Sequence, residues 1–553
     1  MSISEPRADD ARNHRLVLAV LPGLMAGIFL SALDVTVMST SLKTIADGLG
    51  GLDLLAWATT AFLVTETVSG PIYGRLADIY GRKPLYLIAI VLFLVGSLTC
   101  AFAQSMYQLA AFRAIQGLGA GGLVTLPYTI SADIMAPRDR ARYQGYFLAV
   151  WVSASVLGPA VGGLFAGASS FLGIAGWRWI FLVNLPIGLV ALAVIVKALN
   201  VKHYRQTTKV DYWGGVTILV AVAPILMLFE SGRDWGWGSP LFVACLVIGL
   251  LGLSVFLVVQ RRAGDAALIP LRLFRVQTYR MSVLIAATVG VGMFGAISLV
   301  PLYLQLVRGA RPILSGLIML PMMLGVIIAT IASGAIISRR GRYKMLPVVG
   351  AAVTTVGMVG FGFVGVDTPM WVPVLLVVLF GIGVGSCTQA ITMAAQNAVP
   401  ARDTSAATAS LTFIRQMASA LGVALFLSLM FGTLRGSIAS ALRRATTEQD
   451  FAAATHDPAV AEMPRNAPLF DFLNGAQRIP SDSSFLDTMD QALARPFREG
   501  FASSINLVFL LGAGVMVLTC ALALRMKEVP LRDRSVSQLL AEEAEEAGDA
   551  ERA

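Results

Sequence analysis

Long apolar blocks recur along the whole chain and are separated by short polar segments. Each block runs for about 18 to 25 residues, enough for a helix that rises 1.5 Å per residue to cross roughly 30 Å of hydrocarbon. Apolar and polar residues do not alternate within a block, as they would in a membrane barrel, so the pattern predicts helices. The predicted spans cover residues 16–38, 55–75, 85–104, 107–130, 144–167, 179–197, 211–230, 240–260, 281–304, 313–337, 346–366, 370–392, 408–431 and 503–525.

The composition is that of a chain folded in a membrane. Of the 553 residues, 56% are hydrophobic and 14% are charged, whereas about 25% of the residues in a soluble domain are charged. The first block lacks a clear small-residue cleavage site, so we expect a retained span and not a signal peptide. The sequence therefore predicts an all-α polytopic membrane protein with about fourteen spans.

The formal net charge of +9 could indicate a nucleic-acid partner. However, the basic residues lie in short loops and form no basic face interleaved with aromatic residues, so we expect no nucleic acid to bind. Lys and Arg concentrate in the loops on the side of the amino terminus, which predicts that both termini are cytoplasmic. Because Arg greatly outnumbers Lys, as in GC-rich bacterial genomes, we expect a multi-pass protein of a bacterial inner (plasma) membrane.

The cysteines and histidines indicate no metal site, cofactor or catalytic centre. The four cysteines, Cys100, Cys245, Cys387 and Cys520, lie inside apolar blocks without a CxxC pair, which favours buried thiols over disulfides or a metal site. The three histidines are scattered outside the blocks. The chain has no phosphate-binding loop of the form G-x-x-x-x-G-K-[S/T], which argues against direct coupling to ATP. With no nucleophile and base in a recognisable pattern, we do not expect an enzyme.

A loop sequence occurs twice on the same predicted side of the membrane. Gly74, Gly81 and Arg82 recur as Gly334, Gly341 and Arg342, at identical offsets and 260 residues apart. Parallel repeats of this kind relate the two halves of some transporters, and spans 7 and 8 would lie between the halves as an insert. The predicted organisation is a cytoplasmic amino terminus (1–15), a six-helix half (16–197), two inserted spans (211–260), a second six-helix half (281–526) that includes an extracytoplasmic extension (432–502), and a cytoplasmic tail (527–553).

Four stretches of the sequence match known transporter motifs. The loop from Gly74 to Lys83 matches the pattern G-x-L-a-D-r-x-G-R-K, with Ile79 in place of the usual charged residue, and Leu33 to Val37 matches a span-1 motif. A span-4 motif is matched by Leu109, Arg113, Gln116, Gly117, Gly119 and Ala120, and a span-5 antiporter motif by Gly158, Pro159, Gly162 and Gly163, with Ala154 replacing its first Gly. With these motifs the chain resembles the major facilitator superfamily, and in particular its fourteen-span drug:H+ antiporters of the QacA and EmrB type.

Asp34, Arg113, Glu66 and Arg415 are ionisable residues within predicted spans, where charge is costly and indicates function. Asp34 in span 1 is the leading candidate for carrying a proton, although a position near water at the end of the span would also explain it. Arg113 in span 4 cannot lose its proton and needs a carboxylate, substrate, water or carbonyl partner. The resemblance implies that Arg113 tunes proton release near the cavity, against the alternative of a purely structural cavity arginine. Glu66 in span 2 is a second proton carrier, a carboxylate that recognises a cationic substrate, or a structural pairing residue.

Other candidates fall into three groups, each with a structural alternative. Arg415, Gln389, Trp57 and Tyr128 are candidates for a cavity that receives substrate, against ordinary bundle packing. The repeated loop, with Gly74, Asp78, Gly81, Arg82, Lys83, Gly334, Gly341 and Arg342, is a candidate cytoplasmic latch, against a plain positive-inside anchor. The span-5 residues Gly158 and Pro159 are expected to kink the helix as in exporters, against a simple packing notch.

Taken with the resemblance, the residues favour proton-coupled efflux of amphipathic drugs or other small molecules by alternating access. The transporter would be driven by the proton gradient without a cofactor, and its expected partners are a small-molecule substrate, protons and the lipid bilayer. Alternatives are export of a lipid, siderophore or metabolite, with 432–502 as the dock for an extracytoplasmic partner, and a non-transporting receptor or scaffold. We expect a monomer to be functional.

Overall fold

The structure is a computed structural model. It describes residues 6–49, 55–135, 137–166, 168, 170–199, 211–236, 238–310, 312–447, 451, 454, 463, 466, 486 and 489–531. The side chains of Trp57 and Pro159, both named above as candidates, lie outside the described part, as do most of the link between spans 13 and 14 and the tail from residue 532.

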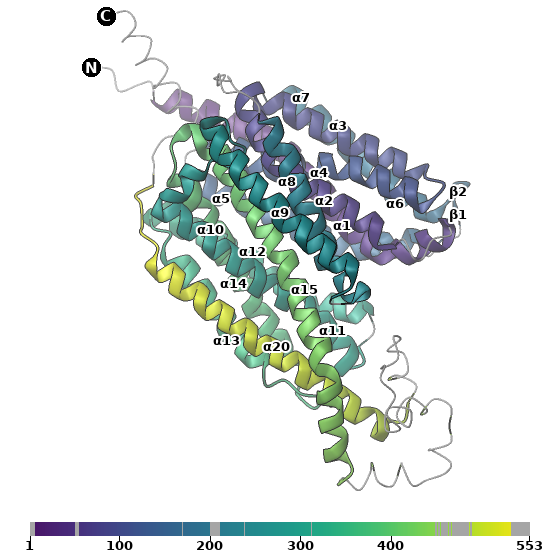
Figure 1. Cartoon of the computed structure of the whole chain (residues 1–553). Coiled ribbons are helices and arrows are strands. Elements are labelled where there is room, and N and C mark those ends of the chain that lie inside the picture. The colour runs from purple at the N-terminus through teal and green to yellow at the C-terminus, as the bar shows by residue number, and fades with distance from the viewer. Residues whose placement is uncertain are drawn as a thin grey trace, which may run out of the picture.

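Helix covers every one of the fourteen predicted apolar blocks (Figure 1). Eleven helical stretches of the described chain are long and apolar enough to cross a membrane, so the expected all-α polytopic membrane fold is confirmed. The long helices are α1 (Pro6–Leu49), α2 (Leu55–Tyr80), α3 (Arg82–Ala101), α4 (Met106–Ile134), α5 (Pro137–Ala166), α7 (Asn184–Ala198), α8 (Tyr212–Trp235), α9 (Pro240–Ala263), α10 (Gln277–Val289), α12 (Pro312–Arg340), α13 (Met345–Phe361), α14 (Trp371–Asn397), α15 (Thr404–Ala445) and α20 (Gln491–Arg525).

Two predicted spans are interrupted. The sixth consists of the short α6 (Trp179–Leu182) and α7. The ninth runs through α10, the π-helical η5 (Gly290–Phe294), α11 (Gly295–Leu302) and the π-helical η6 (Tyr303–Val307). Glycines and Pro301 in this span weaken the regular α-helical hydrogen bonds, which lowers the free-energy cost of forming π-helical turns. Between α5 and α6 the chain forms a small hairpin of β1 (Ser170–Phe171) and β2 (Ile174–Ala175), where the sequence predicted no strand.

Corresponding helices pack in the same pairs in the two halves of the chain. In the first half α4 packs against α2 and α3, and α7 packs against α1 and α3. In the second half α14 packs against α12 and α13, and α20 packs against α10 and α13. The halves meet where α2 lies against α15 and α5 lies against α12. This repeated pairing agrees with the loop repeat read from the sequence.

The helices α8 and α9 pack against one another, and α8 also contacts both α2 and α15 (Figure 1). Apolar side chains of α8, such as Ile218 and Val222, join Val68 of α2 in one cluster. The buried amide of Gln260 closes the end of this pair, donating to Asp211 Oδ2 at 2.8 Å and accepting from the Ile269 nitrogen at 2.8 Å. The pair therefore bridges the two halves.

The two ends of the bundle differ in the elements that they contain. The basic end holds the α2–α3 and α12–α13 turns and the carboxyl end of α20, and the extension end holds the α13–α14 turn. α15 has 42 residues and α20 has 35, so each exceeds the roughly 20 residues that cross a bilayer. Near the extension end they pack closely, because a Cβ on Gly500 would lie 2.7 Å from the Ile438 Cα.

Candidate functional site

A buried carboxylate, Asp34 of α1, is held by donors from two other helices. The side chains of Asp34 and Arg113 are each only 1% exposed and form an ion pair through Asp34 Oδ2 and Arg113 Nη1. The other oxygen, Asp34 Oδ1, accepts from Gln116 Nε2 at 2.8 Å and from Asn184 Nδ2 at 3.1 Å. Asp34 is thus an enclosed ion-pair partner and does not reach water at the end of α1.

A second set of groups orients these donors. The Ser97 hydroxyl of α3 accepts from Gln116 at 3.3 Å and from Asn184 at 3.0 Å, and it donates to the Phe181 carbonyl at 2.9 Å. α3 comes this close because position 96 is glycine: a Cβ there would lie 2.5 Å from the Gln116 nitrogen. The network therefore joins α1, α3, α4 and α7.

Arg113 is held on several sides. Its Nη1 donates to Gln116 Oε1 at 2.8 Å, one helical turn away on the same face of α4. Its guanidinium carbon lies 4.0 Å from the centroid of the Phe62 ring, which is a favourable cation–π geometry. The sequence required a carboxylate, substrate, water or carbonyl partner for Arg113, and in the structure the partner is a carboxylate.

Glu66 of α2 adds a second acid beside this pair. It is 7% exposed, and its Oε1 accepts from the Ser31 hydroxyl at 3.4 Å. Glu66 also interacts electrostatically with both Arg113 and Asp34. The three ionisable residues expected from the sequence to work together are therefore brought together, with two carboxyl groups and one guanidinium.

The span-5 motif lies against the segment that carries Asp34. The Thr36 hydroxyl donates to the Ala154 carbonyl at 3.2 Å, and a Cβ on Gly158 would collide with the Thr36 side chain. The Ser41 hydroxyl donates to the Gly162 carbonyl at 3.3 Å. Gly163, in contrast, faces open space. Small residues of α5 thus allow close packing onto α1. The side chain of Pro159, where the sequence predicts a kink, is not among the described side chains.

The first copy of the repeated loop connects the two halves at the basic end. Arg82 pairs with Asp78 at 2.7 Å and also with Asp133 of α4 at 2.6 Å. Its Nη2 donates to the hydroxyl of Ser405 at the start of α15, in the other half. A Cβ on Gly74 would lie 2.6 Å from the Ala409 Cβ, so α2 and α15 approach closely here.

Lys83 contacts a different part of the bundle. Its ammonium group donates to the Val196 carbonyl near the carboxyl end of α7 at 2.7 Å. A cation at the end of a helix satisfies an unpaired carbonyl and complements the helix dipole. Lys83 therefore anchors the carboxyl end of α7.

The second copy of the loop shares a glycine turn with the first copy but has different partners, and its next helix begins later, at Met345. Gly81 and Gly341 both have positive φ, of 98° and 66°, and both donate to the carbonyl four residues earlier. Gly334 is buried, whereas Arg342 is exposed. The next residue, Tyr343, donates from its nitrogen to Glu528 Oε1 at 3.0 Å. Its hydroxyl accepts from the Val529 nitrogen at 3.0 Å. This copy holds the segment after α20 in place.

Two of the expected cavity residues, Arg415 and Tyr128, lie on α15 and α4, which contact one another across the halves. The Tyr128 ring packs edge-to-face on Phe147 at 5.5 Å. Gln389 is 5% exposed and lies within α14. A Cβ on Gly290 of η5 would lie 2.8 Å from the Arg415 carbonyl, so the π-helical turn packs directly on this part of α15.

Four participants were not expected from the sequence in these roles. Asn184 stands out only as a polar residue in the apolar span 179–197, within the segment Asn184-Leu185-Pro186. Ser97, Asp133 and Ser405 carry no signal of their own, because their importance arises from helices that pack together in three dimensions. The described residues contain no group of three or more His, Cys, Asp and Glu side chains able to hold a metal.

Comparison with known proteins identifies the family. The profile of the Major Facilitator Superfamily matches residues 24–423. The chain belongs to this superfamily. An MFS-type transporter of Mycobacterium tuberculosis, itself described as uncharacterized, is 32% identical over 533 residues, covering 96% of this chain and 71% of the relative. The multidrug transporter protein MdtP of Bacillus subtilis is 31% identical over 412 residues, covering 74% of this chain and 75% of MdtP.

Solved structures share the fold. The human organic anion transporter MFSD10 superposes with a TM-score of 0.58 at 14% identity, covering 91% of this chain and 99% of that one. The proton:xylose symporter XylE superposes with a TM-score of 0.57 at 15% identity, covering 95% of this chain and 99% of XylE. The protein is therefore an all-α membrane transporter of the superfamily, with relatives named as multidrug transporters and efflux pumps.

Proposed function

We propose that this protein is a proton-coupled antiporter that exports amphipathic small molecules by alternating access. The efflux relatives support the direction and the cargo class. The single observation that carries the proposal is a buried cluster in which Asp34 is ion-paired with Arg113 and a second buried acid, Glu66, lies close enough to interact electrostatically with both. We place the basic end in the cytoplasm, following the distribution of Lys and Arg in the sequence.

Charge balance explains why this cluster suits a proton. Two carboxylates and one guanidinium leave one negative charge uncompensated, and a buried uncompensated charge is costly. Binding one proton to either carboxyl group makes the cluster neutral. A proton that moves between Asp34 and Glu66 would release Arg113 from one carboxylate and offer it the other.

Coupling then requires that the proton changes the contact between the halves. Asp34 and Arg113 lie on α1 and α4, and α4 also carries Asp133, which holds Arg82 in its contact with Ser405. A shift of α4 when the cluster is protonated would move Asp133 and so disturb the contact between Arg82 and Ser405. One proton crossing 100 mV supplies about 2.3 kcal/mol, comparable with the loss of a few such interactions.

Flux in proteoliposomes tests the proposal. Vesicles containing the purified protein would be loaded with a panel of lipophilic cations and neutral amphipaths, and a pH gradient would be imposed. We expect release of at least one compound to accelerate with an opposing proton gradient, with counterflow of protons reported by an internal pH dye. A protonophore should remove the acceleration, and protein-free vesicles should show none. If the pH gradient left the release rate of every transported compound unchanged, proton coupling would be contradicted.

A further inference from the structure

The two acids of the buried cluster have different surroundings, although a proton on either one would balance the charges. Each oxygen of Asp34 faces a donor. Arg113 Nη1 donates to Oδ2, and the side-chain amides of Gln116 and Asn184 donate to Oδ1 at 2.8 Å and 3.1 Å. A proton on Asp34 would therefore point at a donor from either oxygen and would weaken the ion pair with Arg113.

The amides of Gln116 and Asn184 are held in the orientation that donates to Asp34. Gln116 Oε1 accepts from Arg113 Nη1 at 2.8 Å, and because a guanidinium can only donate, the Gln116 nitrogen is left to face Asp34. Asn184 Nδ2 also donates to the Ser97 hydroxyl at 3.0 Å, whose own proton goes to a backbone carbonyl at 2.9 Å. Turning either amide to accept a proton from Asp34 would break one of these bonds.

Glu66 has surroundings that suit a carboxyl group able to bind a proton. Its hydrogen-bond partner among the described residues is the hydroxyl of Ser31, which lies 3.4 Å from Glu66 Oε1 and is buried. A hydroxyl can donate to a carboxylate or accept from a protonated carboxyl group, so Ser31 can serve both forms. Arg113 and Asp34 interact with Glu66 through space, so proton uptake by Glu66 leaves the hydrogen bonds of their ion pair in place.

The described parts of the helices that pack on α2 bring two charged groups to Glu66, which are Arg113 of α4 and Asp34 of α1. The helices α3, α8 and α15 also pack on α2, but no charged group among their described residues interacts with Glu66. The ion pair of Asp34 and Arg113 is neutral as a whole. An ionised Glu66 is therefore the uncompensated charge of the cluster, and a proton on Glu66 removes that charge.

We propose that Glu66 is the acid that takes up the proton in this conformation, while Asp34 remains the ionised partner of Arg113. This role for Glu66 rests on the proposed proton coupling and names the residue that binds the proton. Ser31 is a positioning residue, whose hydroxyl turns from donor to acceptor when Glu66 is protonated. Glu66 lies about 12 Å along α2 from Gly74, where α2 touches α15 of the other half. Proton uptake thus acts on the helix that makes this contact.

Infrared difference spectroscopy of the full-length protein in detergent tests the assignment without a substrate or a gradient. A carboxyl group that takes up a proton gains a C=O stretching band, and isotope labelling of the side-chain carboxyl carbon of glutamate or of aspartate shows which residue type carries it. We expect a band that grows as the pH is lowered through the neutral range, shifts with labelled glutamate and not with labelled aspartate, and is lost in Glu66→Gln. Asp34→Asn should also lose the band, because Glu66 alone must then balance Arg113.

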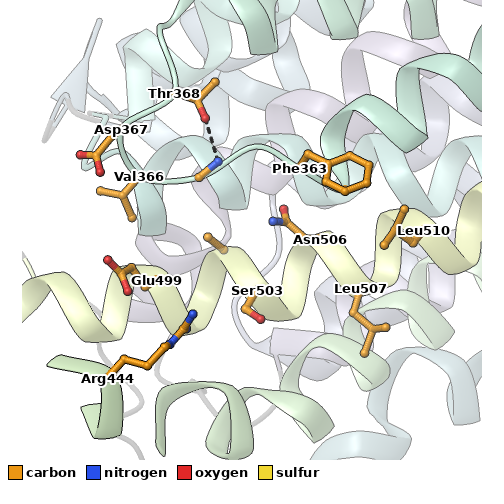
Figure 2. Close-up of a pocket in the computed structure, with 13 residues that line it drawn as sticks. Phe363, Val366, Asp367, Thr368, Arg444, Glu499, Ser503, Asn506, Leu507 and Leu510 are labelled. Atoms are coloured by element: carbon orange, nitrogen blue, oxygen red, sulfur yellow. Dashed lines mark hydrogen bonds between the residues drawn. The ribbon is translucent and has the colours of Figure 1, made fainter. Parts of the chain in front are cut away.

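Glu499 supplies the matched control. It lies on α20 facing the loop that carries Asp367, where both acids line a groove at the extension end (Figure 2). Its side chain is 30% exposed and pairs with Arg495 at 3.1 Å. Glu499→Gln therefore removes a glutamate from an ion pair in contact with solvent and should leave the band unchanged.

Variants of Ser31 test its positioning role. Ser31→Ala removes the partner of Glu66, so it should keep the band but move it to the frequency of a carboxyl group without this hydrogen bond. Ser31→Thr retains a hydroxyl, and its band should stay close to that of the unmodified protein.

A band that shifts with labelled aspartate, or one that survives in Glu66→Gln, would overturn the assignment and place the proton on another group. The absence of any such band across the neutral range would overturn it as well. Flux judges the coupling separately. Gradient-driven release together with an aspartate band would leave the proposed function standing, whereas a glutamate band together with release that the gradient leaves unchanged would contradict the coupling and not the site.

Discussion

Asp34→Asn is the change that tests the buried cluster most directly. It removes the negative charge and leaves nearly the same shape, so Arg113 loses its only ion-pair partner among the described residues. The amide also fits poorly, because Asp34 Oδ1 receives two donors and Oδ2 receives the guanidinium. Whichever way the new amide turns, its NH2 group faces a donor.

The size of the effect follows from burial. With both side chains 1% exposed, loss of the ion pair and of well-placed acceptor bonds should cost about 1–3 kcal/mol of stability, because Glu66 still balances the charge of Arg113. The double variant Asp34→Asn with Glu66→Gln removes both negative charges, leaves Arg113 buried and uncompensated, and should cost about 3–5 kcal/mol. Both variants should lack proton-coupled efflux, so the difference in stability between them reports the charge that Glu66 balances.

The assay combines thermal unfolding in detergent with proton-driven efflux in proteoliposomes. Glu528→Gln serves as the control, because it removes an exposed carboxylate at the basic end but keeps an oxygen for the Tyr343 nitrogen. It should unfold and transport like the unmodified protein. Efflux by Asp34→Asn at the unmodified rate under a pH gradient would refute the coupling role. An unchanged melting temperature would refute the energetic argument.

Three further changes test other parts of the structure. Gly74→Leu should overpack the α2–α15 contact, at a cost of about 1–3 kcal/mol of stability. It should also favour separation of the halves at the basic end, which double electron–electron resonance distances would report. Arg342→Gln, at the exposed equivalent of Arg82, should change these distances far less. Gln260→Leu should lower stability by about 1–3 kcal/mol, because Asp211 and the Ile269 nitrogen lose a buried partner; an unchanged melting temperature would contradict this. Replacement of residues 448–488 by a short Gly/Ser connector should leave small-molecule exchange measurable, and its complete loss in a folded variant would place this link in the transport core.

The helices could be predicted from the sequence because the membrane imposes a simple rule. A segment that crosses hydrocarbon must satisfy its backbone internally and stay apolar over about 20 residues. Breaks within spans are harder to predict, because π-helical turns such as η5 depend on how closely the neighbouring helix packs against them. The motif residues Asp34 and Arg113 were predicted individually from their charge, and their pairing required the packing of α1 on α4.

The rest of the candidate site could not be read from the sequence for the same reason. Ser97 and Ser405 are small polar residues of a kind that occurs throughout membrane helices, and only the close approach at glycines brings them into contact with charged groups. Lys83 and Arg342, in contrast, belong to a recognisable motif whose pattern does not reveal their surroundings. Both belong to the repeated motif, yet Lys83 anchors α7 and Arg342 is exposed. A repeat predicts a similar turn, whereas partners depend on each half's surroundings.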